Sequence, residues 1–209
     1  MINSEVISVI KDITKKDKKE RTLKEKLIIS FYENVSMIAV GAVAVMLIFT
    51  FGFRVSGIEG TSMLPTLEDG DRVVLTAYDG NPQKGQVIIS VQPNAFGKPV
   101  VKRIIATENQ TVDIDFTEGK VYVDGILLSE PYINNLTINS DDVAFPVTVP
   151  EGHVFVMGDN RQGSTDSRST KIGFIDENYI LGVVKYRMVN IDDETGEISR
   201  IDFENMKVN

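Results

Sequence analysis

The sequence predicts a mainly β protein that is preceded by one N-terminal transmembrane helix. An uncharged apolar run near the amino terminus predicts the helix, and a series of short segments rich in Val, Ile and Phe predicts the β-structure. A length of 209 residues leaves room for the helix and one globular unit of about 150 residues. Because 42% of the residues are hydrophobic and 25% are charged, this unit can bury a core.

The apolar run covers residues 35–53, contains no charged residue, and is bracketed by Glu33 and Arg54. As a helix it would span about 28 Å, which is close to the thickness of a bilayer's hydrocarbon core. A cleaved secretory signal peptide is the main alternative, but its charged region would be 34 residues long, and the Ala42-x-Ala44 pattern lies inside the run. A helix packed on the core of a soluble protein is also disfavoured, because an uninterrupted apolar stretch of this length has no polar face.

The charge distribution predicts the orientation of this helix. Residues 1–34 form a basic segment that carries eight Lys or Arg against six Asp or Glu. The positive-inside rule therefore places this segment in the cytoplasm and the remainder of the chain outside. With a total formal charge of -8, the rest of the chain sums to -10. An acidic domain argues against nucleic acid as a partner, and interspersed acidic residues disfavour a DNA-binding tail.

Gly, Pro and Asn clusters separate the expected strands, and Asp124-Gly125 predicts a hairpin. The expected strands are residues 72–78, 86–91, 100–106, 111–116, 120–128, 153–157 and 179–189. We therefore expect a core domain built from residues 54–106 and 151–189, a small inserted β-subdomain at 107–150, and a tail at 190–209.

The composition excludes several kinds of site. The chain has no Cys and a single His, so thiol peptidases, disulfide scaffolds and two-histidine zinc motifs are excluded. A Ser-His-Asp triad could use only His153, which begins an expected strand without an evident acid-base partner. We interpret His153 as structural, and we expect no metal and no cofactor.

Two segments contain candidate catalytic residues. Ser62 follows two small residues, Gly60 and Thr61, and precedes a loop stiffened by Pro65. The segment at 100–105 contains the basic pair Lys102-Arg103 in an apolar strand, so alternation would turn one of the two into an apolar face. Only lysine can lose its proton in a protein, and burial lowers its pKa, so Lys102 is the candidate base. Taken alone, Ser62 could be a turn residue and Lys102 could extend from an edge strand into solvent.

A third segment, at residues 158–168, is a polar loop directly after an apolar strand. It contains Asp159, Ser164, Asp166 and Arg168. Such a loop could be an ordinary exposed loop with weak ion pairs, or it could orient the two candidate catalytic side chains through hydrogen bonds.

Together these segments resemble the bacterial type I signal peptidases, which are serine proteases with a Ser/Lys dyad. The family's S-M-x-P-T-L box matches residues 62–67, its G-D-x-V box matches 70–73, and its K-R box matches Lys102-Arg103. Its G-D-N-R-x-x-S-x-D-S-R box matches 158–168 at every fixed position. The resemblance covers roughly residues 35–185, and Gly60 and Lys102 place it with the Gram-positive-like, prokaryotic branch.

The resemblance implies an antiparallel β-rich catalytic domain of the signal-peptidase type on the outer side of the cell membrane. Ser62 would be the nucleophile and Lys102 the general base, with an acyl-enzyme intermediate. The backbone N–H of Ser62, beside Gly60, would hold the oxyanion. Ser164 would hydrogen-bond Lys102, while the remaining supporting residues would be Asp159, Asp166, Arg168 and Arg103.

The partners implied by the resemblance are the lipid bilayer and exported preproteins with small residues at positions -1 and -3 of the signal peptide. Ser62 lies nine residues after Phe53, at most about 30 Å of extended chain, so the nucleophile is expected near the membrane surface. One segment departs from the family: after Lys102-Arg103 a G-x-P-G-D sequence is usual, and here residues 106–110 read ATENQ. The turn at this point is expected to be reshaped.

Two other functions remain as alternatives. Self-cleaving repressors also use a Ser/Lys dyad, but they have a DNA-binding domain and no anchor. A non-catalytic, membrane-anchored scaffold or pilus-assembly factor would be expected to lack Ser62 or Lys102, and both are present.

Overall fold

The chain divides into two units, Met1–Phe49 and Thr50–Asn209. The computed structural model describes residues 7–8, 22–47, 54–93, 96–188 and 204–205. The expected tail at 190–209 therefore lies outside the described residues except for 204–205.

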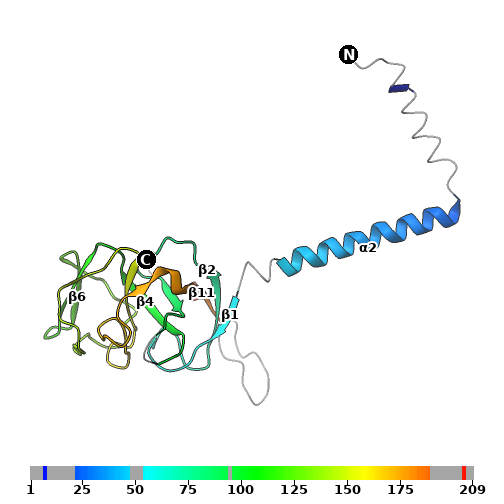
Figure 1. Cartoon of the computed structure of the whole chain (residues 1–209). Coiled ribbons are helices and arrows are strands. Elements are labelled where there is room, and N and C mark those ends of the chain that lie inside the picture. Colours follow the sequence, from blue (N-terminus) through cyan, green and yellow to red (C-terminus); the bar gives the residue numbers. More distant parts are fainter. Residues whose placement is uncertain (1–6, 9–21, 48–53, 94–95, 189–203, 206–209) are drawn as a thin grey trace. The chain divides into compact units, whose positions relative to one another are not determined.

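The first unit contains the helix α2, Leu23–Leu47, which is drawn as one uninterrupted helix in Figure 1. It begins in a capping box, because Thr22 N donates to Glu25 Oε2 at 2.8 Å and Glu25 N donates to Thr22 Oγ1 at 3.4 Å. The helix therefore starts earlier than the apolar run at 35–53, and residues 48–53 lie outside the described residues. Among the described residues, one helix is long and apolar enough to cross a bilayer, from Leu23 to Met46.

The second unit contains a large antiparallel sheet with the strand order β1-β2-β11-β3-β4-β9-β10, and β12 pairs with β11. A short 3-10 helix, Glu177–Tyr179, joins β10 to β11. The strand bounds are β1 Arg54–Gly57, β2 Arg72–Ala77, β3 Val87–Ser90, β4 Val100–Ala106, β9 His153–Met157, β10 Ile175–Asp176, β11 Ile180–Met188 and β12 Glu204–Asn205.

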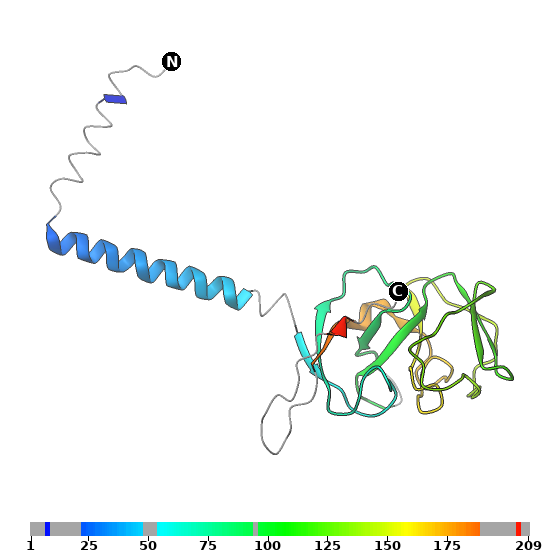
Figure 2. The same ribbon diagram turned by 180° about the vertical axis from the view of Figure 1, so that it is seen from behind.

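A smaller antiparallel sheet has the order β7-β6-β5-β8 and lies within residues 107–150. Its strands are β5 Thr111–Asp115, β6 Lys120–Val123, β7 Ile126–Leu127 and β8 Val147–Thr148. The predicted hairpin is present between β6 and β7, where Asp124 and Gly125 have φ values of 52° and 75°. Positive φ at both positions is what a type I′ turn requires. Figures 1 and 2 show β1 and β6 at opposite ends of the unit.

One hydrophobic cluster joins the two sheets. Ile105, Phe155 and Met157 of the large sheet pack with Val112 and Val121 of the small sheet, and all five are buried. A second cluster lies beneath the loop between β1 and β2, and a third lies between β3, β9 and β11. The strand β4 contributes to all three, so both of its faces are buried.

The mainly β prediction is confirmed, and β4 and β9 have the predicted bounds. The predicted segment 120–128 is divided into β6 and β7 by the Asp124-Gly125 turn. Sequence reasoning missed β1, β8, β10 and β12, which have four residues or fewer and too little apolar alternation to be recognised. Partner strands define these elements more than their own residues do.

Candidate active site

Ser62 lies in the loop between β1 and β2, and this loop is fixed to the core from below. Met63 and Leu67 are 1% and 0% exposed, and they pack in the cluster beneath the loop. Ile58 N donates to Asp71 O at 2.8 Å, which closes the base of the loop. The apolar residues of the segment therefore hold the loop down, while the half-buried Ser62 stays accessible.

Gly60 meets two requirements beside Ser62. Its φ of +88° is a conformation that residues with a side chain rarely adopt, and its N–H donates to Asp69 Oδ1 at 2.6 Å. A Cβ at this position would meet no atom within 4 Å, so open space adjoins the loop there. Among the described residues, none accepts a hydrogen bond from the Ser62 backbone N–H, so that donor is available to a ligand.

Lys102 contacts Ser62 directly. Its side chain comes from β4 and is 5% exposed, and Nζ donates to Ser62 Oγ at 2.9 Å and to Val101 O at 2.9 Å. Burial lowers the pKa of Lys102 from 10.5 to about 8, although the negative charges of Asp166 and Asp159 oppose the change. A buried amine with this pKa can be neutral near physiological pH and can accept a proton from a hydroxyl group.

Arg103 is buried as well, so both basic residues of the pair lie inside the fold. Arg103 is 2% exposed, and its Nε and Nη2 donate to the two carboxylate oxygens of Asp159 at 2.8 and 2.6 Å. Its Nη1 donates to Gly85 O at 2.7 Å, and its guanidinium carbon lies 4.0 Å from the ring centroid of Tyr132. Alternation does turn the two side chains to opposite faces, but β4 is a central strand with both faces covered.

The polar loop at 158–168 contacts the loop that contains Ser62. Asn160 N donates to Ser62 O at 3.1 Å, and Asn160 Nδ2 donates to Thr61 O at 3.1 Å. Thr66 donates its hydroxyl proton to the Asp159 carboxylate. These bonds connect the two loops at both ends of the S-M-L-P-T segment.

Asp166 and Arg168 form a bidentate ion pair, and both side chains are 0% exposed. Arg168 Nε and Nη2 donate to the two carboxylate oxygens at 2.8 and 2.9 Å, and Gly158 N donates to Asp166 Oδ2 at 2.9 Å. The expected pairing of Arg168 with an aspartate is thus present. It holds the turn of the loop at the position where Gly158 meets Ser164.

Ser164 does not form the expected hydrogen bond to Lys102. Its Oγ is buried and has no hydrogen-bond partner among the described residues. The turn instead presses Ser164 against Gly158, where an added Cβ would lie 2.3 Å from Ser164 Oγ and 2.5 Å from Ser62 O. Glycine at position 158 therefore allows three chain segments to meet beside Ser62.

His153 lies at the start of β9, and its Nδ1 contacts Glu151 O at 2.8 Å. This contact is local, and among the described residues His153 forms no hydrogen bond with those around Ser62. Within the described ranges, no group of three His, Asp or Glu side chains is placed to hold a metal ion.

Sequence reasoning missed several residues that support the site. Arg187 Nε lies 2.7 Å from Asp71 Oδ2 and ties the base of the loop that contains Ser62 to β11. Glu130 and Tyr132 come from the inserted segment, and they contact Arg161 and Arg103 respectively. Arg161 belongs to the G-D-N-R sequence and could have been named as a candidate site residue for that reason. No sequence pattern marks its partner Glu130 in the insert.

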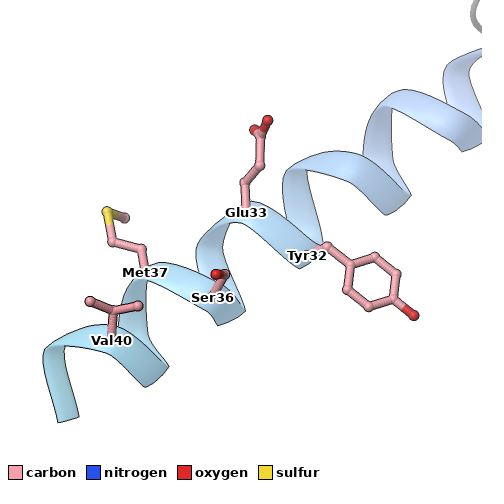
Figure 3. A pocket seen from close by; sticks show the side chains of 5 residues that line it. All are labelled: Tyr32, Glu33, Ser36, Met37 and Val40. Atoms are coloured by element: carbon pink, nitrogen blue, oxygen red, sulfur yellow. The ribbon is translucent and has the colours of Figure 1, made fainter. Parts of the chain in front are cut away.

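Two surface hollows lie outside this cluster. One is lined only by residues of α2, and Figure 3 shows Glu33, Met37 and Val40 on one side of the helix while Tyr32 points away from them. The other lies beside β2 and β11, where Tyr78 donates to Glu177 Oε2 at 2.6 Å. Neither is lined by Ser62 or Lys102.

A loop serine and a buried lysine meet on an antiparallel β scaffold, an arrangement similar to that of serine peptidases that use a Ser/Lys dyad. Residues 31–189 match the family model described as "Signal peptidase, peptidase S26". The chain therefore belongs to this signal peptidase family.

Relatives and a solved structure give the extent of the similarity. The chain is 35% identical over 167 residues to "Signal peptidase I" of Bacillus licheniformis, which covers 75% of this chain and 88% of the relative. It is 37% identical over 166 residues to "Probable signal peptidase I-1" of a Synechocystis strain, with 74% and 81% covered. A crystal structure of a signal peptidase I from Enterococcus faecalis matches at 31% identity and a TM-score of 0.42, covering 49% of this chain and 96% of that one.

Proposed function

We propose that this chain is a membrane-bound serine endopeptidase that removes signal peptides from exported preproteins. Membership of the signal peptidase family supports the reaction class and the type of substrate. The observation that carries the mechanism is the 2.9 Å contact between the buried Lys102 Nζ and Ser62 Oγ. In this proposal Ser62 is the nucleophile and Lys102 is the general base.

The first half of the reaction forms an ester on Ser62. Neutral Lys102 accepts the hydroxyl proton while Ser62 Oγ attacks the carbonyl carbon of the scissile bond. The tetrahedral oxyanion accepts a hydrogen bond from the backbone N–H of Ser62, beside the open space at Gly60. The Lys102 ammonium then gives its proton to the leaving nitrogen, so the mature protein departs with a free amino group.

The second half of the reaction restores the enzyme. Lys102 removes a proton from a water molecule, and the resulting hydroxide attacks the ester carbonyl. Ser62 Oγ leaves and regains the proton from Lys102, and the signal peptide is released with a carboxylate end. One water molecule is consumed, and both side chains return to their starting states.

The membrane part of the proposal rests on α2. Its apolar length suits a single membrane crossing, and the basic segment before it favours a cytoplasmic amino terminus. The catalytic unit would then work on the outer side of the cell membrane, where a signal peptide emerges from the bilayer. Preference for small residues at positions -1 and -3 belongs to the same proposal.

A cleavage assay in detergent tests the proposed dyad. A preprotein with an Ala-x-Ala site is incubated with wild type, Ser62→Ala or Lys102→Met, and the mature product is quantified. We expect processing by wild type and none by either variant. Ser129→Ala and Lys84→Met change an exposed serine and an exposed lysine, and these controls should process normally. Equal processing by all five proteins would refute the dyad.

A further inference from the structure

We propose that Glu130 and Arg161 are positioning residues of the active site, and that the inserted segment at 130–143 thereby holds the polar loop at 158–168 (the catalytic loop) in place. This inference rests on the proposed endopeptidase function and deepens it. It assigns a role in the reaction to a part of the chain that lies outside the motifs containing the nucleophile and the base.

The Glu130–Arg161 pair is buried and bidentate. Arg161 is 1% exposed, and its Nη1 and Nη2 donate to Glu130 Oε2 and Oε1 at 3.0 and 2.5 Å. Two further donors are used as well, because Nη1 reaches Thr137 Oγ1 at 2.8 Å and Nε reaches Gly158 O at 3.0 Å. Two of the acceptors come from the insert, and one comes from the catalytic loop.

The Gly158 carbonyl that Arg161 binds belongs to a residue that lies next to Ser62. Gly158 lies so close to the Ser62 carbonyl that an added Cβ would be 2.5 Å from that oxygen. Asn160, which precedes Arg161, donates its backbone N–H to the same Ser62 carbonyl at 3.1 Å. Arg161 therefore fixes the backbone at Gly158. Because Gly158 and Asn160 both adjoin the Ser62 carbonyl, this backbone positions Ser62 against Lys102.

The rest of the 130–143 segment follows the same loop. Asn134 N donates to Asp159 O at 3.1 Å, and Asn135 Nδ2 donates to Asn160 Oδ1 at 3.3 Å. Farther along, Arg168 Nη1 donates to Asn139 O at 3.2 Å, and Val143 N donates to Arg168 O at 3.1 Å. The segment contains no helix or strand, so contacts with the catalytic loop take the place of ladder hydrogen bonds.

A buried arginine-carboxylate pair contributes more to the orientation of the groups around it than to the stability of the fold. Desolvation offsets much of the attraction of such a pair, and well-packed apolar residues can often replace it without loss of stability. The planar guanidinium, however, orients its acceptors in a fixed fork. An apolar replacement could retain the fold and yet leave Gly158 O without a partner that defines its position.

The experiment compares two variants with wild type in the detergent cleavage assay. The double variant Glu130→Met/Arg161→Met removes both charges together. Glu130→Asp keeps the negative charge, but its shorter side chain moves the carboxylate away from Arg161. Glu118→Asp, at an exposed carboxylate in the same insert, is the matched control. Unfolding by denaturant gives the folded fraction, and hydrogen exchange of residues 60–66 and 158–164 gives the local order of the two loops.

We expect kcat per folded molecule to fall by about tenfold to a hundredfold, with KM changed by less than about twofold, because small displacements of reacting groups have effects of this size. Faster exchange in both loops, with β6 unchanged, should accompany the loss. Wild-type kcat in either folded variant, or unchanged exchange in the two loops, would overturn the inference. Absence of cleavage by wild type would refute the proposed function instead, and hydrogen exchange would still decide the positioning role.

Discussion

Lys102 Nζ lies 2.9 Å from Ser62 Oγ, although the two residues are separated by 40 positions in the chain. The lysine comes from a central strand, and the serine comes from a loop that core residues hold in place. The contact therefore depends on the register of β4 as well as on the packing beneath the loop.

The pH dependence of the reaction should report the buried lysine. In the proposed mechanism Lys102 must be neutral in the free enzyme, and its pKa is lowered to about 8 by burial. We expect kcat/KM to rise with pH through an apparent pKa of about 8, measured with a substrate that does not titrate in this range. A profile that is flat between pH 6 and 10 would contradict the role of Lys102 as a base.

Stability should depend on the same group. The pKa of Lys102 is lower in the folded chain than its ordinary value of 10.5, so the unfolded chain binds more protons between about pH 8 and 10.5. Stability from this group therefore rises as pH rises through that window. At about 1.36 kcal/mol for each tenfold change in the equilibrium, the buried ammonium costs about 3 kcal/mol at pH 7.

Lys102→Met should consequently be more stable than wild type at pH 7 while it is inactive. Denaturant unfolding at pH 7 and pH 10 measures the difference between the two proteins, which should shrink at the higher pH. Lys84→Met, at an exposed lysine, should show no such difference. A difference in stability between the two proteins that is the same at pH 7 and pH 10 would contradict the penalty on the buried ammonium.

Gly158→Ala should reduce cleavage strongly. The new Cβ would lie 2.3 Å from Ser164 Oγ and 2.5 Å from the Ser62 backbone carbonyl. The backbone of residue 158 can move away from this carbonyl only by displacing the loop that contains Ser62. We expect a loss of at least about a hundredfold in kcat, since the reacting groups would shift. Gly57→Ala, where a Cβ meets nothing within 4 Å, is the control and should stay active. Normal turnover by Gly158→Ala would contradict the close packing at this point.

Ser164→Ala separates a structural role from a role in the chemistry. Because Ser164 Oγ is buried without a partner, its removal should leave the free energy of unfolding unchanged or slightly raise it. If the hydroxyl bonds to Lys102 once substrate is bound, kcat should nevertheless fall, and Ser129→Ala should not have this effect. Unaltered kcat in Ser164→Ala would remove Ser164 from the set of orienting residues.

The absence of cysteine allows a direct test of orientation. Single-cysteine variants Ser4→Cys and Ser129→Cys would be treated in intact cells with a membrane-impermeant maleimide. We expect labelling at position 129 in intact cells and at position 4 only after lysis, as a cytoplasmic amino terminus requires. The reverse pattern would invert the proposed topology.

How far the sequence could predict this molecule depended on the range of the interactions. The Asp124-Gly125 turn and the strand β4 were predicted because local patterns determine them. The burial of Arg103 was not, since its partner Asp159 lies 56 positions away and no short-range pattern connects the two. The early start of α2 at Leu23 had a local signal in Thr22 and Glu25 that an argument based on apolar residues alone overlooked.

Within the site, the motifs identified the two candidate catalytic residues but not all of their supports. Ser164 matches a fixed motif position, yet its contact with Gly158 depends on how the 158–168 loop turns in space. Glu130 could not be found at all, because one glutamate in an irregular segment has no distinguishing sequence context. Long-range pairs of this kind become visible only when the chain is folded.

The central position of β4 gives the two candidate catalytic residues different local stabilities. Lys102 pairs with Ile88 of β3, and β9 pairs with the same strand from Arg103 onward, so we expect the backbone of Lys102 to exchange hydrogen only when the sheet itself opens. Ser62 belongs to a loop whose bonds to Asn160 and Asp71 can break while the sheet stays intact. On warming, Ser62 should lose its alignment before Lys102 does. Cleavage should therefore be lost at a temperature below that at which the domain unfolds.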